Sequence, residues 1–332
     1  MRVVRHCIAS SLLIALIVPG LPAEEKPAAA CAAAAQRYRI VPVPLRPYHV
    51  NDASAVAGMT YDHRAGLWTE KNGLKTIELP AGFHHAEGVD VNERGQLLGT
   101  ASTADGARRQ SFVWEAGKLT PISGDGAKAA AINATGDLAG EAKLAGSAGT
   151  EPALWRKNKV VGLGACCGGR ASALNSRGDV VGEAYDKQGR YQAFMWDEKA
   201  GLRLIGLEDT YSTAVAINER GHVLVYAFTE GSVLYRSGVS TALELSKRWP
   251  SQPRAMNGCD VVVGSFGSNS DESEAFLWDE KGGFRNLNDF IPRNSSWKLE
   301  VASSINDRGE IAGWGDHNGE DDAGFLLIPE TR

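Results

Sequence analysis

Several features that would assign this chain to a familiar class of protein are scarce or missing. Five cysteines in 332 residues are too few for the disulfide framework of a small secreted domain. The net charge is −5 and no long basic run occurs, which argues against nucleic acid as a partner. The sequence has no Ser-His-Asp order, phosphate-binding loop or Cys-x-x-Cys metal spacing. No common catalytic motif is therefore available to explain its function.

Long hydrophobic runs are also missing. The main apolar stretch, Ile8–Val18, has 11 residues and is too short to span a membrane. It follows a basic start and precedes Pro19–Ala23, an order typical of a secretory signal peptide. We predict a signal peptide over residues 1–23, a flexible leader over 24–36, and export to the periplasm or the cell exterior without a membrane span after cleavage. A buried core helix is the alternative interpretation.

What the sequence does have is a repeat. Asparagines recur 41, 41, 42, 43, 39 and 49 residues apart, at Asn51, Asn92, Asn133, Asn175, Asn218, Asn257 and Asn306. A glycine follows each one seven residues later, except in the fifth copy, where Val225 takes its place. A later apolar run in each copy ends in an aromatic residue, at Trp68, Trp114, Trp155, Trp196, Tyr235, Trp278 and Phe325. A period of 40 to 45 residues is typical of a propeller blade.

Each copy predicts four short strands: two joined at the asparagine turn, one ending at the aromatic residue, and one after the next glycine. We therefore predict an all-β, seven-bladed β-propeller over residues 37–332, with four antiparallel strands per blade. The last copy lacks a fourth strand, whereas residues 38–43 form a strand outside any copy. We predict that this N-terminal strand completes the last blade and closes the ring.

The repeat also carries a family resemblance. The pattern Ile-Asn-x-x-Gly-x-Val-x-Gly followed by Ala-Phe-x-Trp, as in Ala193–Trp196, resembles the HAF-type extracellular repeat. The similarity covers residues 37–329 and is strongest at Ile305–Gly313. The histidine of the His-Ala-Phe signature is missing, with Gln192 and Glu274 in its place. The resemblance implies export and a propeller-like fold, and it transfers no catalytic motif.

We interpret the repeated polar and aromatic residues as structural. Asparagine starts turns and bonds its own backbone, and a repeated tryptophan is typical of core or blade-to-blade packing. The residues assigned in this way are Asn92, Asn133, Asn175, Asn218, Asn306, Trp114, Trp155, Trp196 and Trp278.

Candidate functional residues lie outside the repeat, in loops that the fold places on one face over blades 7, 1 and 2. They are His63, His84, His85, Asp316 and His317. Imidazoles beside carboxylates hold divalent metals or transfer protons. The alternative is that all five are ordinary solvated loop residues.

Cysteine pairing is left open by the sequence. Cys166 and Cys167 are adjacent in a glycine-rich loop, where a vicinal disulfide is one possibility in an oxidising compartment. Cys259 falls in a turn on the opposite face, so we expect it to pair with neither of them.

The absence of a catalytic constellation favours a non-enzymatic binding or scaffold module. We predict a monomer without a cofactor that binds a protein or glycan through the loop face. The alternative is a metal-dependent hydrolase or lyase with its site on the loops of blades 7, 1 and 2.

Overall fold

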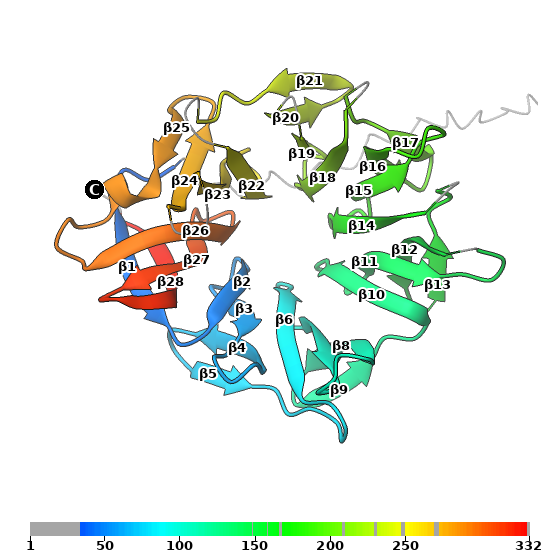
Figure 1. The fold of residues 1–332 in the computed structure, drawn as a ribbon, viewed down its shortest axis with the longest axis horizontal. Helices are drawn as coiled ribbons and strands as arrows, with labels where there is room; N and C mark the ends of the chain where they lie inside the picture. Colours follow the sequence, from blue (N-terminus) through cyan, green and yellow to red (C-terminus); the bar gives the residue numbers. More distant parts are fainter. Residues whose placement is uncertain are drawn as a thin grey trace, which may run out of the picture.

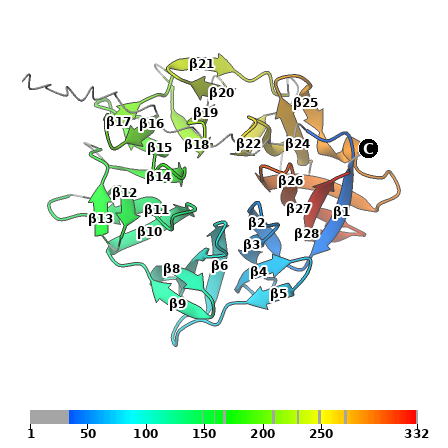
Figure 2. The same cartoon turned by 180° about the vertical axis from the view of Figure 1, so that it is seen from behind.

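The protein is a ring of seven four-stranded antiparallel sheets (Figure 1, and from behind in Figure 2). This computed structural model describes residues 34–330 apart from 148, 158, 166, 167, 208, 209, 229, 230, 247–249 and 269–271. The predicted seven-bladed propeller is confirmed. The predicted signal peptide and residues 24–33 of the predicted leader lie outside the described residues. In the described part of the chain, no helix is long and apolar enough to cross a membrane.

The strands of each blade, which we call A to D from the central axis outward, follow chain order except in blade 7, whose strand D is β1 (Figure 1). Blades 1 to 3 are β2 (Arg46–Val50), β3 (Val56–Met59), β4 (Ala65–Thr69), β5 (Gly73–Thr76); β6 (His85–Val91), β7 (Leu97–Ser102), β8 (Arg109–Glu115), β9 (Lys118–Pro121); and β10 (Asp125–Ile132), β11 (Leu138–Lys143), β12 (Thr150–Arg156), β13 (Lys159–Gly162).

Blades 4 to 6 are β14 (Gly169–Leu174), β15 (Val180–Tyr185), β16 (Tyr191–Asp197), β17 (Gly201–Leu204); β18 (Ser212–Ile217), β19 (Val223–Ala227), β20 (Gly231–Arg236), β21 (Val239–Ala242); and β22 (Ser251–Met256), β23 (Val262–Phe266), β24 (Glu274–Asp279), β25 (Gly283–Asn286). A 3-10 turn, η1 (Leu287–Phe290), follows β25. Blade 7 is β26 (Trp297–Ile305), β27 (Ile311–His317), β28 (Glu320–Pro329) and β1 (Tyr38–Val43).

The two ends of the chain meet in blade 7. Strand β1 pairs antiparallel with β28 in an unbroken register from Tyr38 opposite Pro329 to Val43 opposite Gly324. This is the predicted closure by residues 38–43, and it is confirmed. Pro42 lies in this outermost strand. Its missing N–H is tolerated there because no further strand pairs with the outer edge.

The repeated glycine lies opposite a bulge in the A strand of six blades, and in blade 5 the same bulge lies opposite Val225. In blade 3 the register between β10 and β11 shifts at Ala130, opposite Gly140. A Cβ on Gly140 would lie 2.0 Å from the carbonyl oxygen of Lys128, so only glycine fits. The bulged residues of all seven blades line the central channel, at Tyr48, Val89, Ala130, Ser172, Val215, Arg254 and Ser303.

Hydrophobic clusters lie between neighbouring blades. One joins Ala57 and Ile77 of blade 1 to Leu97, Phe112 and Trp114 of blade 2. The repeated tryptophans belong to such clusters: Trp68, Trp114, Trp155 and Trp278 are buried, and Trp196 is half-buried. Each blade therefore supplies one wall of the core of the next, as stacked repeats require.

Blade 7 is larger than the others. Its strands β26, β27 and β28 have 9, 7 and 10 residues, whereas the strands of the other six blades have 4 to 8. The extra length lies at the end of the blade where B connects to C, and it forms a hairpin closed at Asn318-Gly319. The hairpin builds one wall of the pocket described below.

The seven repeated asparagines form a closed ring of hydrogen bonds. Within its own turn each Oδ1 accepts two backbone N–H groups, as Asn92 does from Arg94 at 3.1 Å and Gln96 at 3.0 Å. Each Nδ2 donates to the backbone carbonyl of the asparagine in the next blade, at 2.8 to 3.4 Å. Asn306 of blade 7 donates to Asn51 of blade 1, so the series has no free end.

Removing one member of this ring should destabilise the whole fold. Asn133→Ala deletes the bond to Asn175 and leaves the turn N–H groups of Thr135 and Asp137 without their acceptor. Because the amide is buried, we expect the free energy of unfolding to fall by about 1–3 kcal/mol. Urea denaturation measures this, with Asn72→Ala in an exposed turn as the control. A change of less than about 0.5 kcal/mol, typical of a surface site, would contradict the proposed role.

Candidate binding site

The two ends of the ring differ in what they expose. The A–B and C–D turns, with the asparagine ring, make up one end, which we call the Asn face. The D–A and B–C connections make up the other end, the loop face. A central channel runs between the A strands, and a second cavity, the loop-face pocket, opens over blades 6, 7 and 1.

The central channel has a volume of about 450 Å³ and is lined by the A strands of all seven blades. Most of the strand residues facing it are small or aliphatic. Three A-strand residues that line it carry charge-bearing side chains: His49, Asp90 and Arg254. They break the seven-fold symmetry and are the candidates for chemistry in the channel.

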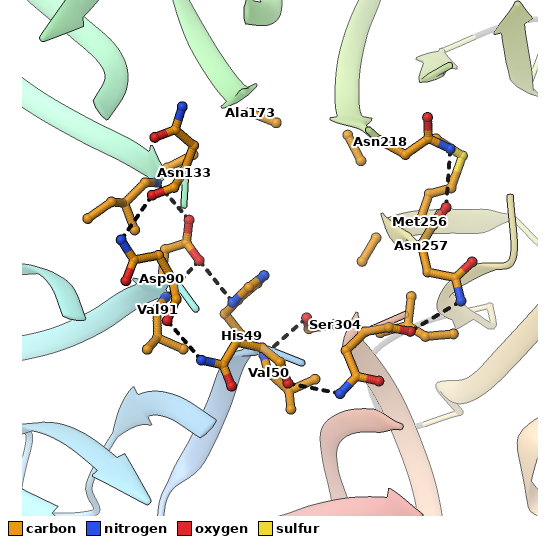
Figure 3. Close-up of a pocket in the computed structure, with 18 of the residues that line it drawn as sticks. His49, Val50, Asp90, Val91, Asn133, Ala173, Asn218, Met256, Asn257 and Ser304 are labelled. Carbon is orange, nitrogen blue, oxygen red and sulfur yellow. Dashed lines mark hydrogen bonds and ion pairs between the residues drawn. The ribbon is translucent and has the colours of Figure 1, made fainter. Parts of the chain in front are cut away.

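His49 and Asp90 form a pair that links neighbouring blades. His49 Nδ1 lies 2.9 Å from Asp90 Oδ1, and the imidazole ring points into the channel (Figure 3). Asp90 also accepts the N–H of Val91 at 2.7 Å and that of Ile132 in blade 3 at 2.8 Å. One carboxylate therefore holds groups from blades 1, 2 and 3.

Burial and the ion pair act in opposite directions on both groups. Burial lowers the pKa of His49, but the Asp90 carboxylate outweighs it, so the pKa of His49 is raised. Burial raises the pKa of Asp90, but the His49 imidazole and the backbone N–H bonds leave that pKa lowered. Each partner therefore favours the charged form of the other, and the pair acts as a blade-to-blade contact.

The Asn-face mouth of the channel is acidic, but its carboxylates bond to backbone. Asp52 accepts the N–H of Asp307 at 2.8 Å, and Glu93 accepts the N–H of Asp52 at 3.0 Å. Burial raises the pKa of both Asp52 and Glu93, and the negative charge of Asp307 raises both further. The bonds run from blade to blade outside the asparagine ring, which makes this mouth part of the closure.

The loop-face pocket is the larger cavity, with a volume of about 850 Å³. The A strands and B–C hairpins of blades 6 and 7 line it, together with Arg46 at the start of β2. Arg254 lines both this pocket and the channel, and therefore stands where the two cavities meet.

Charged groups of both signs face this pocket. Arg46 pairs with Asp322 at 3.5 Å, and Lys298 pairs with Glu300 at 3.0 Å. The Arg46 guanidinium lies 4.2 Å from the centre of the Trp314 ring, and that of Arg254 lies 5.7 Å from it. Guanidinium groups at such distances are attracted to the ring face, so the indole fixes both arginines.

A second feature of the loop face is an aromatic patch over blades 4 and 5. We define it by Tyr185, Tyr191, Tyr211, Tyr226 and Phe228. The centre of the Tyr191 ring lies 4.3 Å from that of Tyr185 and 6.5 Å from that of Tyr211, and Tyr226 and Phe228 are 5.2 Å apart. Phe228 is 63% exposed and Tyr211 is 50% exposed. Clustered exposed aromatic side chains of this kind are typical of a surface that binds another molecule.

The structure brings only some of the predicted site residues together. The rings of His63 and His85 meet edge to face, with centres 5.7 Å apart, and His84 is exposed beside them. His317 instead stacks on Trp297, with ring centres 4.2 Å apart and an interplanar angle of 10°. It ends strand β27 and does not lie in a loop.

The predicted metal set is not assembled. Among the described residues, no three His, Cys, Asp or Glu side chains form a group that could hold a metal ion. Asp316 lines the loop-face pocket, so of the five predicted residues it alone belongs to that cavity. The pocket lies over blades 6, 7 and 1, one blade away from the predicted sector.

Cys166 and Cys167 lie outside the described residues, so the vicinal disulfide stays a prediction. Cys259, in the A–B turn of blade 6, is disulfide-bonded.

Sequence reasoning missed the pocket, the channel pair and the aromatic patch. One signal for the pocket was present: the interval between Asn257 and Asn306 is 49 residues, against 39 to 43 elsewhere. This interval contains the 3-10 turn η1 and the long strand β26 of blade 7, whereas the hairpin of β27 and β28 follows Asn306. Arg254 occupies a bulge position held elsewhere by tyrosine, valine, alanine or serine, but the bulge itself is not visible in the sequence.

Comparisons with known proteins identify the fold alone. No protein-family model and no curated protein matches the sequence. Among solved structures, YCF48 bound to a D1 peptide aligns with a TM-score of 0.56 and 11% identity, covering 89% of this chain and 97% of that one. Virginiamycin B lyase from Staphylococcus aureus gives 0.57 and 10%, covering 88% and 99%. The WD40 propeller domain of Doa1 gives 0.56 and 14%, covering 90% and 97%.

The channel pair predicts a pH-dependent stability. Folding raises the pKa of His49, so protonated His49 stabilises the folded state. This stabilisation is fully present below the ordinary histidine pKa near 6.5 and is lost as the pH rises through the raised pKa. A lowered pKa of Asp90 gives stability that is present above about 4 and is lost as the pH falls. The pair therefore contributes most between about pH 4 and 6.5.

We expect the difference in unfolding free energy between the wild type and His49→Gln to shrink from pH 6 to pH 9. Urea midpoints across that range measure it, and His84→Gln, at an exposed position, is the control. A difference that is constant with pH would show that His49 carries no charge-dependent role.

Proposed function

We propose that this protein binds another protein through its loop face, with the loop-face pocket and the aromatic patch as its two contact areas. One observation carries the proposal. Among the described residues, the exposed aromatic side chains Tyr61, Tyr191, Tyr211 and Phe228 all lie on the face that holds the pocket. The large aliphatic side chains that are exposed, Val160, Val161, Leu204 and Val239, lie on outer D strands.

Exposed aromatic residues beside a polar pocket are typical of a protein interface. Tyrosine and tryptophan dominate hot spots because they bury much area at little entropic cost. The patch fits a protein better than a sugar, because Tyr185 and Tyr191 already pack on each other at a 33° tilt. Their hydroxyl oxygens are 2.5 Å apart, which ties the two rings together. A sugar-stacking platform needs an open ring face.

The fold is compatible with this role. The YCF48 structure shows a propeller of similar fold with a peptide bound, and the lyase shows that the same fold also supports catalysis. For this chain, no group of metal-binding side chains in the described residues supports a metal-dependent hydrolase or lyase. Binding is therefore the function that the side chains favour.

We also propose that the protein is exported, as the first 23 residues predict. The disulfide bond at Cys259 supports this, because disulfides persist mainly in oxidising compartments. N-terminal sequencing of the protein from its own host tests the proposal. We expect a start at or near Glu24, and a mature protein that begins at Met1 would contradict it.

Site-specific photo-crosslinking tests the binding function. With a crosslinking residue at Tyr211, we expect the full exported chain to capture one defined protein from the host's extracytoplasmic fraction. With that protein purified, Phe228→Ser should weaken binding about tenfold, as loss of an aromatic anchor does. Val239→Ser is a matched control, because Val239 is 64% exposed on an outer strand and Phe228 63% on the loop face.

Equal effects of the two serine substitutions would contradict a loop-face site. Capture of a glycan in place of a protein would overturn the choice of partner.

A further inference from the structure

We propose that Arg254 forms a carboxylate-binding subsite at the floor of the loop-face pocket, and that the partner places a carboxylate of its polypeptide chain there. This inference rests on the proposed function and specifies the chemistry of the same site. It assigns a role to a residue that neither the repeat nor the closure of the ring explains.

The position of Arg254 is set by the backbone. It is the bulged residue of β22, and the bulge directs it toward the axis at the junction of the channel and the pocket. At the equivalent bulge the other six blades have uncharged residues, although blade 7 has a second bulge at Glu300. The arginine is therefore a departure from the repeat at the one place that both cavities reach.

Arg254 lacks a counter-charge, whereas the other cations of the pocket have one. Arg46 pairs with Asp322, and Lys298 pairs with Glu300. The guanidinium of Arg254 makes no hydrogen bond or ion pair with any described residue. It lies 5.7 Å from the centre of the Trp314 ring. Arg254 is exposed to the cavity, and partial desolvation, followed by the charge of Arg46, lowers its pKa, in keeping with a positive charge that has no anion beside it.

A second nitrogen in the same corner is also unsatisfied. The Nε of Arg46 is buried without a hydrogen-bond partner. A buried donor of a charged group costs free energy until an acceptor reaches it. The Nε of Arg46 lies beneath the surface, so it is Arg254 that presents an unpaired guanidinium to the cavity, and a planar carboxylate matches the fork geometry of that group.

The rim of the pocket selects the kind of anion. Asp316 and Asp321 line the same cavity, and no ion pair within the described residues neutralises either one. Their charge repels a phosphate or a polyanion, whereas a single carboxylate at the floor is compatible with it. We therefore expect the bound segment to carry a carboxylate, from a chain terminus or an acidic side chain, next to a basic residue that meets the rim.

Peptide libraries test this directly on the full exported chain. We would measure binding of fluorescent random hexapeptides in three forms: with a free C-terminus, with an amidated C-terminus, and amidated without Asp or Glu. We expect the third form to bind about tenfold more weakly than the first, since a desolvated charge pair is lost. The first two forms distinguish a terminal carboxylate from a side-chain carboxylate.

Variants connect the effect to the residue. Arg254→Gln should reduce binding of the carboxylate peptides about tenfold, and Arg254→Lys, which keeps the charge but loses the fork, should reduce it less. Arg109→Gln is the control, because Arg109 is exposed at the loop-face end of β8. Thermal melting of each variant verifies that it is folded.

The outcomes separate the two proposals. If acid-free amidated peptides bind as well as the others, or if the crosslinked partner binds Arg254→Gln with unchanged affinity, the subsite is wrong and loop-face binding stands. If no peptide binds and no partner is captured from any loop-face position, both proposals are wrong.

Discussion

The buried amide of the repeated asparagine is the interaction on which the rest of this structure depends. Its oxygen holds the turn of its own blade, and its nitrogen holds the backbone of the next one. Seven such contacts close into a ring because the last asparagine reaches the first. The Velcro-like pairing of β1 with β28 closes the outside of the propeller, and the asparagine ring closes the inside.

The repeated glycine is linked to the same constraint. In six blades the A strand bulges opposite it, and the close backbone approach excludes a side chain at that position in blade 3. The bulge brings one residue per blade to the channel, where the repeat imposes no identity. Substitution at a bulge position is therefore compatible with the fold, which leaves Arg254 available for another role.

The fold could be predicted well from the sequence because the same packing pattern occurs in seven copies. The closing strand followed from the missing fourth strand of the last copy. The hydrogen bond from each asparagine to the next blade was not predictable. Sequence spacing indicates a turn at each asparagine but not which backbone carbonyl lies beside its side chain. The His63, His85 and His317 set illustrates the limit. Two of the rings meet, but His317 stacks on Trp297, a contact set by strand register that no motif records.

The proposed binding features share an origin: they lie where the copies differ. Blade 7 is long, and its hairpin walls the loop-face pocket. The aromatic patch is assembled from non-repeating residues in the loops and at the loop-face ends of strands in blades 4 and 5. Seven-fold repetition provides a rigid support, and departures from it on one face supply recognition. An equivalent cluster of exposed aromatics does not occur on the Asn face within the described residues.

Hydroxyl-radical footprinting of the protein with and without its captured partner tests this account most directly. We predict protection of Tyr191, Tyr211 and Phe228, together with pocket residues such as Phe266, while Val160 and Val239 on the outer strands stay reactive. Protection confined to the outer strands or to the Asn face would contradict the account.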